Sequence, residues 1–286
     1  MAAASGDEPV HNFQIDIGLI NEDAHALRSR VHLAADRWAR IVRGTDLEDI
    51  AWEPGTVSCG GLEYDYPNDV LDDLFVMIDV QDFDGGPGAG VRSTVCGYRY
   101  PSMLPMIGAI IVDNGERAPE AADELLLHGF GHMLGISGSW KMLDLLRNPS
   151  SEDEGADTHF VGERAIAAFV AAGGASYQGA KVPVENSRTY GTPDGHWRES
   201  VFDTELMTSL LQVGADPISA ITIQSLADIG YTVDVELSDV YLLPSSSMAA
   251  ARAAEGSPAI DLSGDVVEGP AVLYDRQGRV VRVIRR

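Results

Sequence analysis

The sequence predicts an α+β fold, and three observations support this class. Residues 13–19 alternate apolar and polar side chains, which is typical of a strand with one buried face. Apolar residues then recur at helical spacing over residues 23–42, and Gly44 is placed to end that helix. Two short apolar runs rich in β-branched residues, 74–80 and 108–112, predict further strands.

A second strong helix is predicted from Pro119 to Gly135. Acidic residues lie near its start, where the helix dipole favours negative charge, and glycine commonly ends a helix. Residues 81–105, rich in glycine and proline, are predicted to be a loop. Further helices are predicted at 162–172 and 217–229.

The C-terminal residues change in composition. A Pro-Ser-Ser-Ser run and an alanine-rich stretch follow residue 243 and predict a linker or an exposed helix. Residues 271–284 form two alternating apolar runs around Asp-Arg-Gln-Gly, which predicts a hairpin. Although arginine is frequent there, we interpret this segment as a small packed or appended hairpin rather than a nucleic-acid tail.

Charge and hydropathy exclude some functions. The chain has 286 residues and a formal net charge of −24, so it lacks the basic face expected of a nucleic-acid-binding protein. No run approaches the ~18 apolar residues of a membrane-spanning helix. The N-terminus carries no basic segment followed by an apolar one, so no signal peptide is visible. The sequence does not indicate an oligomeric state.

Two further features remain open. Cys59 and Cys96 fit either one disulfide in an oxidising compartment or two buried thiols. Asp79, Asp82 and Asp84 precede a glycine-rich run and are candidates for a Ca²⁺ loop, although their spacing differs from that of an EF-hand. Adaptation to salt, or simple compositional bias, is the plainer interpretation of the acidity.

The candidate chemistry lies on the second helix. His128 and His132 are four residues apart, so both imidazoles project from one face within reach of a single ion. Imidazole is a favoured zinc ligand, and a catalytic zinc site has three protein ligands and one open position. Two histidines at this spacing on an apolar helix also fit simple packing.

The surrounding residues favour a metal site. The stretch Leu-His-Gly-Phe-Gly-His-Met-Leu-Gly at 127–135 resembles the metzincin zinc helix, H-E-x-x-H-x-x-G, at every defining position except the second. Downstream, Gly-His-Trp-Arg at 195–198 and Glu-Leu-Met-Thr at 205–208 look like the third zinc ligand and the Met-turn of leishmanolysin-like peptidases. His196 lies 61 residues after Gly135, and that family has a long insertion at this point.

The resemblance, which covers roughly residues 13–243, implies both a fold and a site. It implies a two-lobed metzincin-like fold with a mixed sheet, a zinc helix and a mostly helical or irregular C-terminal lobe. The lobes would be residues 1–135 and 136–243, followed by a linker and hairpin at 244–286. It also implies one Zn²⁺ held by His128, His132 and His196, with Met207 in the turn beneath it, a peptide or protein substrate, and a secreted or extracellular location.

The departure from the family pattern is at Gly129. In such peptidases the glutamate at this position takes a proton from the zinc-activated water and delivers it to the leaving amine. Glycine has no side chain for either task. Loss of the glutamate as general base lowers the rate of hydrolysis by a factor of ~10² to 10⁴. Glycine is also ~1 kcal/mol worse than alanine inside a helix, so helix propensity does not explain it.

Other polar residues have milder interpretations. Glu124 is placed to orient an imidazole through a hydrogen bond. Glu199 and Glu205 are placed to orient the third ligand or to stabilise its turn. Trp197 fits either the cleft or the core. The remaining histidines lie on a polar helix face or in polar surroundings, and we do not expect them to bind metal: His11, His25, His32 and His159.

The leading hypothesis is a zinc metalloendopeptidase of leishmanolysin-like type, disabled in this chain by Gly129. The alternative is a zinc-binding pseudopeptidase that holds peptides or partner proteins without cutting them.

Overall fold

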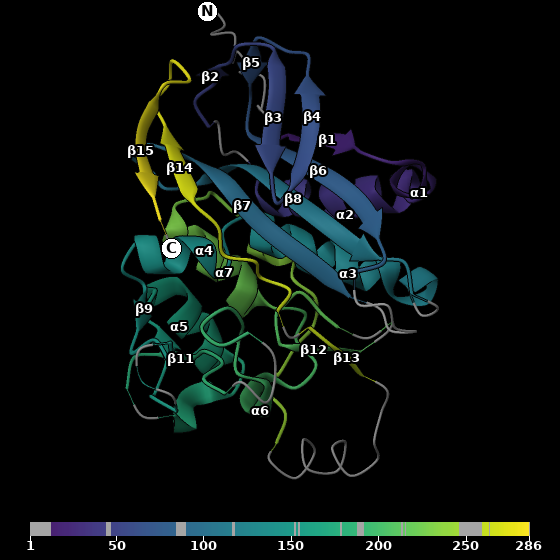
Figure 1. Ribbon diagram of the computed structural model, residues 1–286. Coiled ribbons are helices and arrows are strands. Elements are labelled where there is room, and N and C mark those ends of the chain that lie inside the picture. The colour runs from purple at the N-terminus through teal and green to yellow at the C-terminus, as the bar shows by residue number, and fades with distance from the viewer. Residues whose placement is uncertain are drawn as a thin grey trace, which may run out of the picture.

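A six-stranded mixed sheet carries the N-terminal part of the chain and its C-terminal end (Figure 1). The computed structural model describes residues 13–43, 47–83, 90–115, 118–151, 153, 155–177, 179–187, 192–212, 214, 216–245, 259–262 and 264–285, without the side chains of 118–120. In spatial order the sheet consists of β1 (Ile15–Leu19), β6 (Leu74–Gln81), β8 (Pro105–Asp113), β7 (Val91–Arg99), β14 (Ala271–Tyr274) and β15 (Val280–Ile284).

The strand directions make this sheet mixed. Strands β1, β6 and β8 are parallel, whereas β7 runs antiparallel to β8. Strand β14 is parallel to β7, and β15 is antiparallel to β14. The predicted α+β class and the strands at 13–19, 74–80 and 108–112 are confirmed, as is the C-terminal hairpin, which adds its first strand to the main sheet.

The predicted loop at 81–105 was wrong, because it contains β7 (Figure 1). Glycine and proline are concentrated at 85–90 and at 101 and 105, and they dominated the composition of the whole window. The residues between them, Val-Arg-Ser-Thr-Val-Cys-Gly-Tyr-Arg, include several β-formers that pair with β8 on one side. Ser93 of this strand lies near Gly129, in the helix that carries the site described below.

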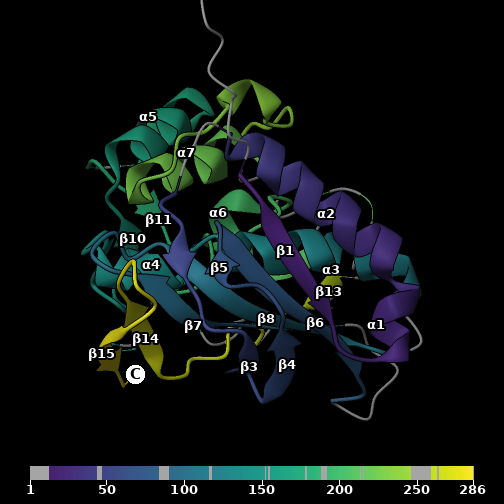
Figure 2. The ribbon, with the colours of Figure 1, turned by 90° about the horizontal axis from the view of Figure 1, so that it is seen from above.

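Helices α1 (Glu22–Ala26), α2 (Arg28–Ile41) and α3 (Ala118–Met133) cover one face of the sheet (Figure 2). The expected helix at 23–42 is therefore two helices, which meet at Leu27. On the opposite face lies the hairpin β3 (Gly55–Cys59) and β4 (Leu62–Tyr66). A disulfide between Cys59 and Cys96 joins this hairpin to β7.

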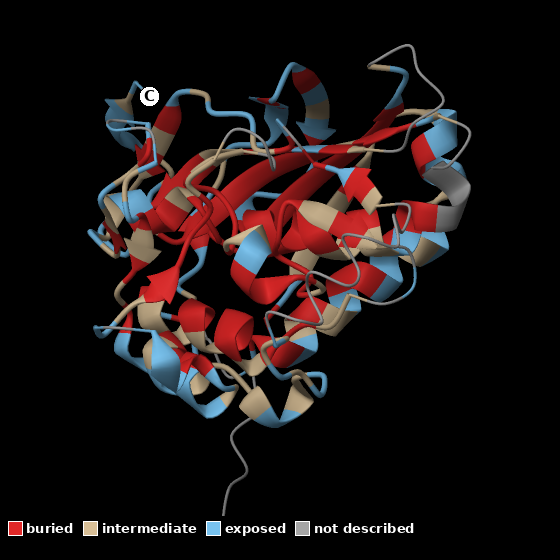
Figure 3. Cartoon of the chain, turned by 90° about the horizontal axis from the view of Figure 1, so that it is seen from below, coloured by how far each residue is buried: buried red, intermediate tan, exposed pale blue. Residues whose placement is uncertain are grey.

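The alternation along β6 explains why both faces of the sheet are covered. Val76 and Ile78 belong to the core on the helix side, whereas Phe75 and Met77 belong to the core beneath the hairpin. Successive side chains of a strand point to opposite faces, so a strand apolar at every position needs a cover on each side. Figure 3 shows the buried residues gathered between these layers.

The residues after α3 form short elements packed below the sheet (Figure 1). The predicted helices at 162–172 and 217–229 are confirmed as α5 (Glu163–Ala171) and α7 (Ala220–Ile229), and Ser219 caps α7 by accepting from the backbone N–H of Thr222. The other elements are α4 (Gly138–Met142), β9 (Leu146–Arg147), β10 (His159–Phe160), β11 (Val182–Pro183), α6 (Glu199–Phe202), β12 (Leu210–Gln212) and β13 (Ala259–Asp261). Two short strands elsewhere, β2 (Ile50–Ala51) and β5 (Val70–Leu71), form a separate pair.

No helix within the described ranges combines the length and the apolar character needed to span a membrane.

Candidate metal centre

Helix α3 presents His128 and His132 one turn apart on one side. The helix is anchored by its fully buried residues Leu125, Leu126 and Phe130. It is also tied to α2, because Nε1 of Trp38 donates to the carbonyl of Leu127 at 2.8 Å. The backbone immediately before the first histidine is therefore fixed by packing and by a hydrogen bond from a neighbouring helix.

The chain leaves α3 sharply at Gly135, which has a φ of +103°. Residues with a side chain rarely adopt this region, so glycine suits the position. A Cβ there would also lie 2.5 Å from Oγ of Ser139. The prediction that this helix ends at Gly135 is confirmed.

His196 reaches the same place from a distant loop. The backbone around it is clamped on both sides: Glu185 N donates to the His196 carbonyl at 2.8 Å, and Trp197 N donates to the Met207 carbonyl at 2.9 Å. Trp197 is fully buried and donates from Nε1 to Thr222, so it belongs to the core rather than to an open cleft. His196 is itself fully buried.

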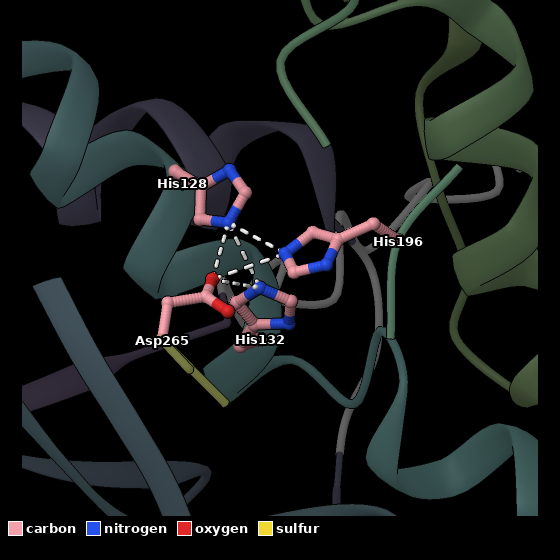
Figure 4. Close-up of side chains that lie close together, drawn as sticks. All are labelled: His128, His132, His196 and Asp265. Carbon is pink, nitrogen blue, oxygen red and sulfur yellow. Dashed lines mark hydrogen bonds and ion pairs between the residues drawn. The ribbon is translucent and has the colours of Figure 1, made fainter. Parts of the chain in front are cut away.

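The three imidazoles converge, and a fourth side chain joins them. Nε2 of His128 lies 2.9 Å from Nε2 of His132 and 3.2 Å from Nε2 of His196. Oδ2 of Asp265 lies 2.9, 3.2 and 3.0 Å from Nε2 of His128, His132 and His196 (Figure 4). All four residues are buried, and together they form a cluster that could hold a metal ion.

The hydrogen bonds of the Nδ1 atoms determine whether the Nε2 atoms, which face the cluster, carry a proton. Each Nδ1 faces a backbone carbonyl: that of Leu206 for His128 (2.7 Å), Ile136 for His132 (3.2 Å) and Thr192 for His196 (3.3 Å). A carbonyl only accepts, so each Nδ1 carries the proton, and Nε2 of the neutral ring keeps its lone pair. Three nitrogen lone pairs and a carboxylate oxygen then face one point with no donor between them. A buried arrangement of this kind is favourable only with a positive charge among these atoms, supplied by a metal ion or by a proton.

Without a metal ion, the rings differ in their tendency to take up a proton. Burial lowers the pKa of His128 to about 4, so this ring stays neutral near pH 7. Burial also acts to lower the pKa of His196, but the charge and hydrogen bond of Asp265 outweigh it and raise that pKa. Burial opposes ionisation of Asp265, yet the His196 charge and the three imidazoles hold the pKa of Asp265 well below its usual range.

The predicted Met-turn lies directly against α3. Met207 is fully buried, and a Cβ added at Gly131 would lie 2.6 Å from Sδ of Met207. Gly131 is therefore small because the Met207 side chain approaches the helix backbone. This close approach explains why glycine occupies this position inside α3 despite its low helix propensity.

Glu205 holds that turn. It is fully buried, and its carboxylate accepts from Met207 N at 2.7 Å and from Ser219 N and Oγ at 3.1 and 2.7 Å. It also accepts from Oγ1 of Thr222. The turn-stabilising role expected of Glu205 is thus what its contacts provide.

Gly129 faces a small, partly polar space. A Cβ at this position would lie 3.3 Å from two carbons of Ile110 and 3.3 Å from Oγ of Ser93. That hydroxyl is buried and has no hydrogen-bond partner among the described residues. A longer polar side chain at position 129, such as that of glutamate, would require small shifts of Ile110 and Ser93. Its polar group would then lie near the unpaired Ser93 hydroxyl.

The other predicted carboxylates do not reach the cluster. Glu124 does not brace an imidazole; its Oε1 accepts from Gly214 N at 2.7 Å. Burial raises the pKa of Glu199 to about 7, and this residue lies outside the cluster. His25 and His32 are exposed on α1 and α2, His159 contacts Asp157, and His11 lies outside the described residues.

The calcium hypothesis remains a prediction. Asp84 lies outside the described residues, and Oδ2 of Asp79 accepts from the side chain of Gln81 at 2.5 Å. Within the described part of the chain, the histidine–aspartate cluster is the one group of potential metal ligands found, and neither Asp79 nor Asp82 belongs to it.

The sequence did not reveal Asp265 as a site residue. It lies 69 residues after His196, in a segment interpreted as a linker leading to a hairpin, and it matches no ligand spacing. The only available signal was an acidic residue directly before two valines, which is too common to be informative. The contact depends on how the C-terminal residues return to the sheet.

Comparison with known proteins adds no family assignment: no protein-family model and no curated protein matches the chain. The similarity to leishmanolysin-like peptidases therefore rests on the motif residues described above.

Proposed function

We propose that this chain is a zinc-binding protein with the site of a leishmanolysin-like metalloendopeptidase, disabled for hydrolysis by Gly129. The observation that carries the proposal is the convergence of the Nε2 atoms of His128, His132 and His196 from two distant segments. The metzincin-like, two-lobed arrangement around a mixed sheet is part of the same proposal.

The donor set favours zinc over other metals. Three imidazole nitrogens and a carboxylate oxygen suit zinc, whereas calcium and magnesium take mainly oxygen ligands. Zinc bonds of 2.0–2.1 Å in a tetrahedron place the ligand atoms about 3.3 Å apart. The ligand atoms here lie 2.9 to 3.2 Å apart, close to that value. Zinc in such a site supplies Lewis-acid activation of water and polarisation of a peptide carbonyl.

The residues around the metal position explain why hydrolysis is not expected. Proton transfer requires a basic side chain beside the reacting water. Gly129 has none. The carboxylates of Glu124 and Glu205 accept hydrogen bonds elsewhere, and Glu199 lies outside the histidine–aspartate cluster. The carboxylate near the histidines, that of Asp265, occupies the position of a fourth ligand instead.

A peptide-binding pseudopeptidase is the second candidate, and Asp265 is the observation that favours it. Catalytic zinc sites keep one position open, whereas structural zinc sites are closed by four protein ligands. Here the fourth ligand comes from the chain itself. The disulfide between Cys59 and Cys96 suits an oxidising compartment, so we propose a secreted or extracellular location for either function.

The test restores the missing base and opens the fourth position together. Zinc-loaded native protein, Gly129→Glu, Asp265→Ala and the double variant are assayed against casein and a quenched peptide library. We expect no proteolysis by the native chain and a gain of at least ~10²-fold for the double variant, since a positioned general base contributes about that much. Gly129→Glu alone should gain less, because Asp265 still occupies the fourth position.

The matched control is Gly129→Gln with Asp265→Ala, which has the size of glutamate without its basicity. It should remain inactive, and a zinc chelator should abolish the gain of the glutamate variant. Chelator-sensitive proteolysis by the native chain would overturn the role given to Gly129. A folded, zinc-loaded double variant without activity would overturn the peptidase assignment and favour the pseudopeptidase.

A further inference from the structure

Strand β15 is the last strand of the main sheet and exposes apolar side chains. It pairs with β14 along one edge, and no strand of the described residues lies along its other edge (Figure 1). Val280, Val281 and Val283 are 57%, 46% and 51% exposed. Proteins commonly protect an edge strand with charged residues, proline or a cover. Three exposed valines in a strand of five residues therefore mark a surface suited to a partner.

Two of these valines lie on the same side of the sheet as hairpin β3–β4. Val283 is opposite Val272 on β14, and the partner of Val280 is Tyr274. Cross-strand partners project from the same face. The ring of Tyr274 contacts that of Trp52 with centroids 5.4 Å apart, and both rings pack against the core beneath hairpin β3–β4. Val280 and Val283 therefore face the same side as that hairpin.

The hairpin β14–β15 also carries free positive charge. Its turn arginines are paired, Arg276 with Glu48 and Arg279 with Asp275. Arg282 and Arg285, in contrast, are exposed and form no ion pair with any other described residue. The chain as a whole has a formal net charge of −24, so this hairpin is a local basic surface on an acidic protein. Its charge favours an acidic partner.

Hairpin β3–β4 presents a complementary acidic face. On β4, Glu63 and Asp65 are exposed, whereas Leu62 and Tyr66 are buried. Because successive side chains of a strand point to opposite faces, both carboxylates project from the outer face of the hairpin. Asp65 accepts a hydrogen bond from Oγ1 of Thr56 at 2.7 Å, which orients its carboxylate on that face. This acidic face and the exposed valines lie on the same side of the sheet.

We infer that this chain forms a twofold dimer in which β15 of each copy covers the outer face of hairpin β3–β4 of the other. The exposed valines supply apolar contact area, and the two unpaired arginines meet the two carboxylates of β4 in the partner subunit. A twofold interface uses the same two patches twice, so each favourable contact counts double. The inference goes beyond the proposed function and does not depend on the metal site.

The large negative charge of each copy does not prevent this contact. At physiological ionic strength, charges more than ~8 Å apart are largely screened, so the local pairs outweigh the total charge. A nucleic acid or an anionic membrane is a less suitable partner. Each would bring many negative charges close to the acidic body of the protein around the hairpin.

The test measures the monomer–dimer equilibrium of the full-length protein by analytical ultracentrifugation. The arginine variant is Arg282→Glu with Arg285→Glu, and the acid variant is Glu63→Arg with Asp65→Arg. Each alone should dimerise at least about tenfold more weakly than the native chain. An equimolar mixture of the two variants should recover dimers, because both contacts of a mixed dimer then join opposite charges.

The matched control changes the same amount of charge on the opposite face. Arg28 and Arg40 are exposed on α2, and Arg28→Glu with Arg40→Glu should dimerise like the native chain. Far-UV circular dichroism checks that every variant is folded. If a charge variant is unfolded, Val280→Thr with Val283→Thr replaces it, since threonine keeps the shape of valine and removes apolar surface. This variant should also dimerise more weakly.

Three results would overturn the inference. The first is a native chain that remains monomeric at every concentration tested. The second is an acid variant that dimerises as readily as the native chain, because β15 would then contact another surface. The third is a monomeric native chain whose hairpin binds a polyglutamate peptide, a DNA duplex or phosphatidylserine vesicles. Zinc content should be equal in all variants, so failure of the dimer is distinguishable from failure of the metal site.

Discussion

Nδ1 of His128 donates to the backbone carbonyl of Leu206 at 2.7 Å, which joins a metal-facing imidazole on α3 to the residue preceding Met207. The position of the first candidate ligand therefore depends on the turn at 205–208. That turn is held from beneath by the buried carboxylate of Glu205. A change far from the metal position should accordingly alter metal binding.

The first prediction concerns Glu205→Gln. The amide oxygen can still accept from Ser219 and Thr222, but an NH₂ group in place of Oε2 confronts the N–H of Met207. We expect a cost of about 1–3 kcal/mol in unfolding free energy and about 10- to 100-fold weaker zinc binding. Chelator competition and thermal unfolding measure the two effects. The exposed Glu236→Gln is the control, and equal zinc affinity in both variants would argue against the link through Leu206.

Two glycines of α3 should respond differently to alanine. At Gly131 a Cβ would lie 2.6 Å from Sδ of the buried Met207, so Gly131→Ala should cost about 1–3 kcal/mol through overpacking. At Gly129 the nearest atoms are 3.3 Å away, and the gain of ~1 kcal/mol in helix propensity offsets the tight fit. Gly129→Ala should therefore stay within about 1 kcal/mol of the native protein. Urea unfolding of both variants measures the two changes in unfolding free energy. A larger loss for Gly129→Ala than for Gly131→Ala would contradict the packing of Met207 against Gly131.

Removal of the disulfide should destabilise the chain. The bond closes a loop with a sequence separation of 37 between β3 and β7. The chain-entropy relation gives about 4 kcal/mol for such a loop, and measured values are typically 2–4 kcal/mol. Cys59→Ser with Cys96→Ser should lower the unfolding free energy by that amount, with Ser58→Ala as a control on the same strand. Identical unfolding of native protein with and without reductant would contradict the pairing.

A pH dependence is expected from Asp216. Burial first, and then the negative charges of Glu205, Glu124 and Glu199, raise the pKa of Asp216 to about 8. Because the pKa of Asp216 in the folded protein is above the ordinary value of 3.8, the protonated carboxyl favours the folded state. This contribution to the free energy of unfolding is complete below about pH 4 and is lost as pH rises toward 8. The variant Asp216→Asn, which does not ionise, should lose less stability than the native protein as pH rises. The difference in Tm between the variant and metal-free native protein should grow from pH 5 to pH 8, by about 2–4 °C per kcal/mol. A constant difference across this range would refute the raised pKa.

Much of the fold followed from local patterns. The continuous apolar run at residues 74–80 and the helical spacing before Gly135 depend on neighbours in the sequence, and both elements formed where expected. The break at Leu27 and strand β7 were missed for local reasons too. In the first case the helix breaks at Leu27, an apolar residue that continues the helical spacing, so the pattern does not mark the break. In the second case, glycines and prolines surround a short run of β-formers.

The site was predictable only in part. His128 and His132 share a helix, so their proximity follows from spacing alone, and His196 was found through the motif around it. Asp265 could not be found in this way, because its place depends on the parallel pairing of β14 with β7, and strand pairing over such a separation leaves no periodic mark in the sequence. The same pairing explains why the tail is part of the sheet and passes over the metal position.

The central claim is that His128, His132 and His196 hold one zinc ion and that Asp265 supplies the fourth ligand. An anomalous difference map from crystals of the zinc-loaded native protein, measured on both sides of the zinc absorption edge, tests it most directly. We expect one strong peak about 2.0–2.2 Å from the three Nε2 atoms and from Oδ2 of Asp265. Absence of a peak among these histidines would contradict the metal site. A peak held by the histidines while Asp265 points away would contradict the closed fourth position.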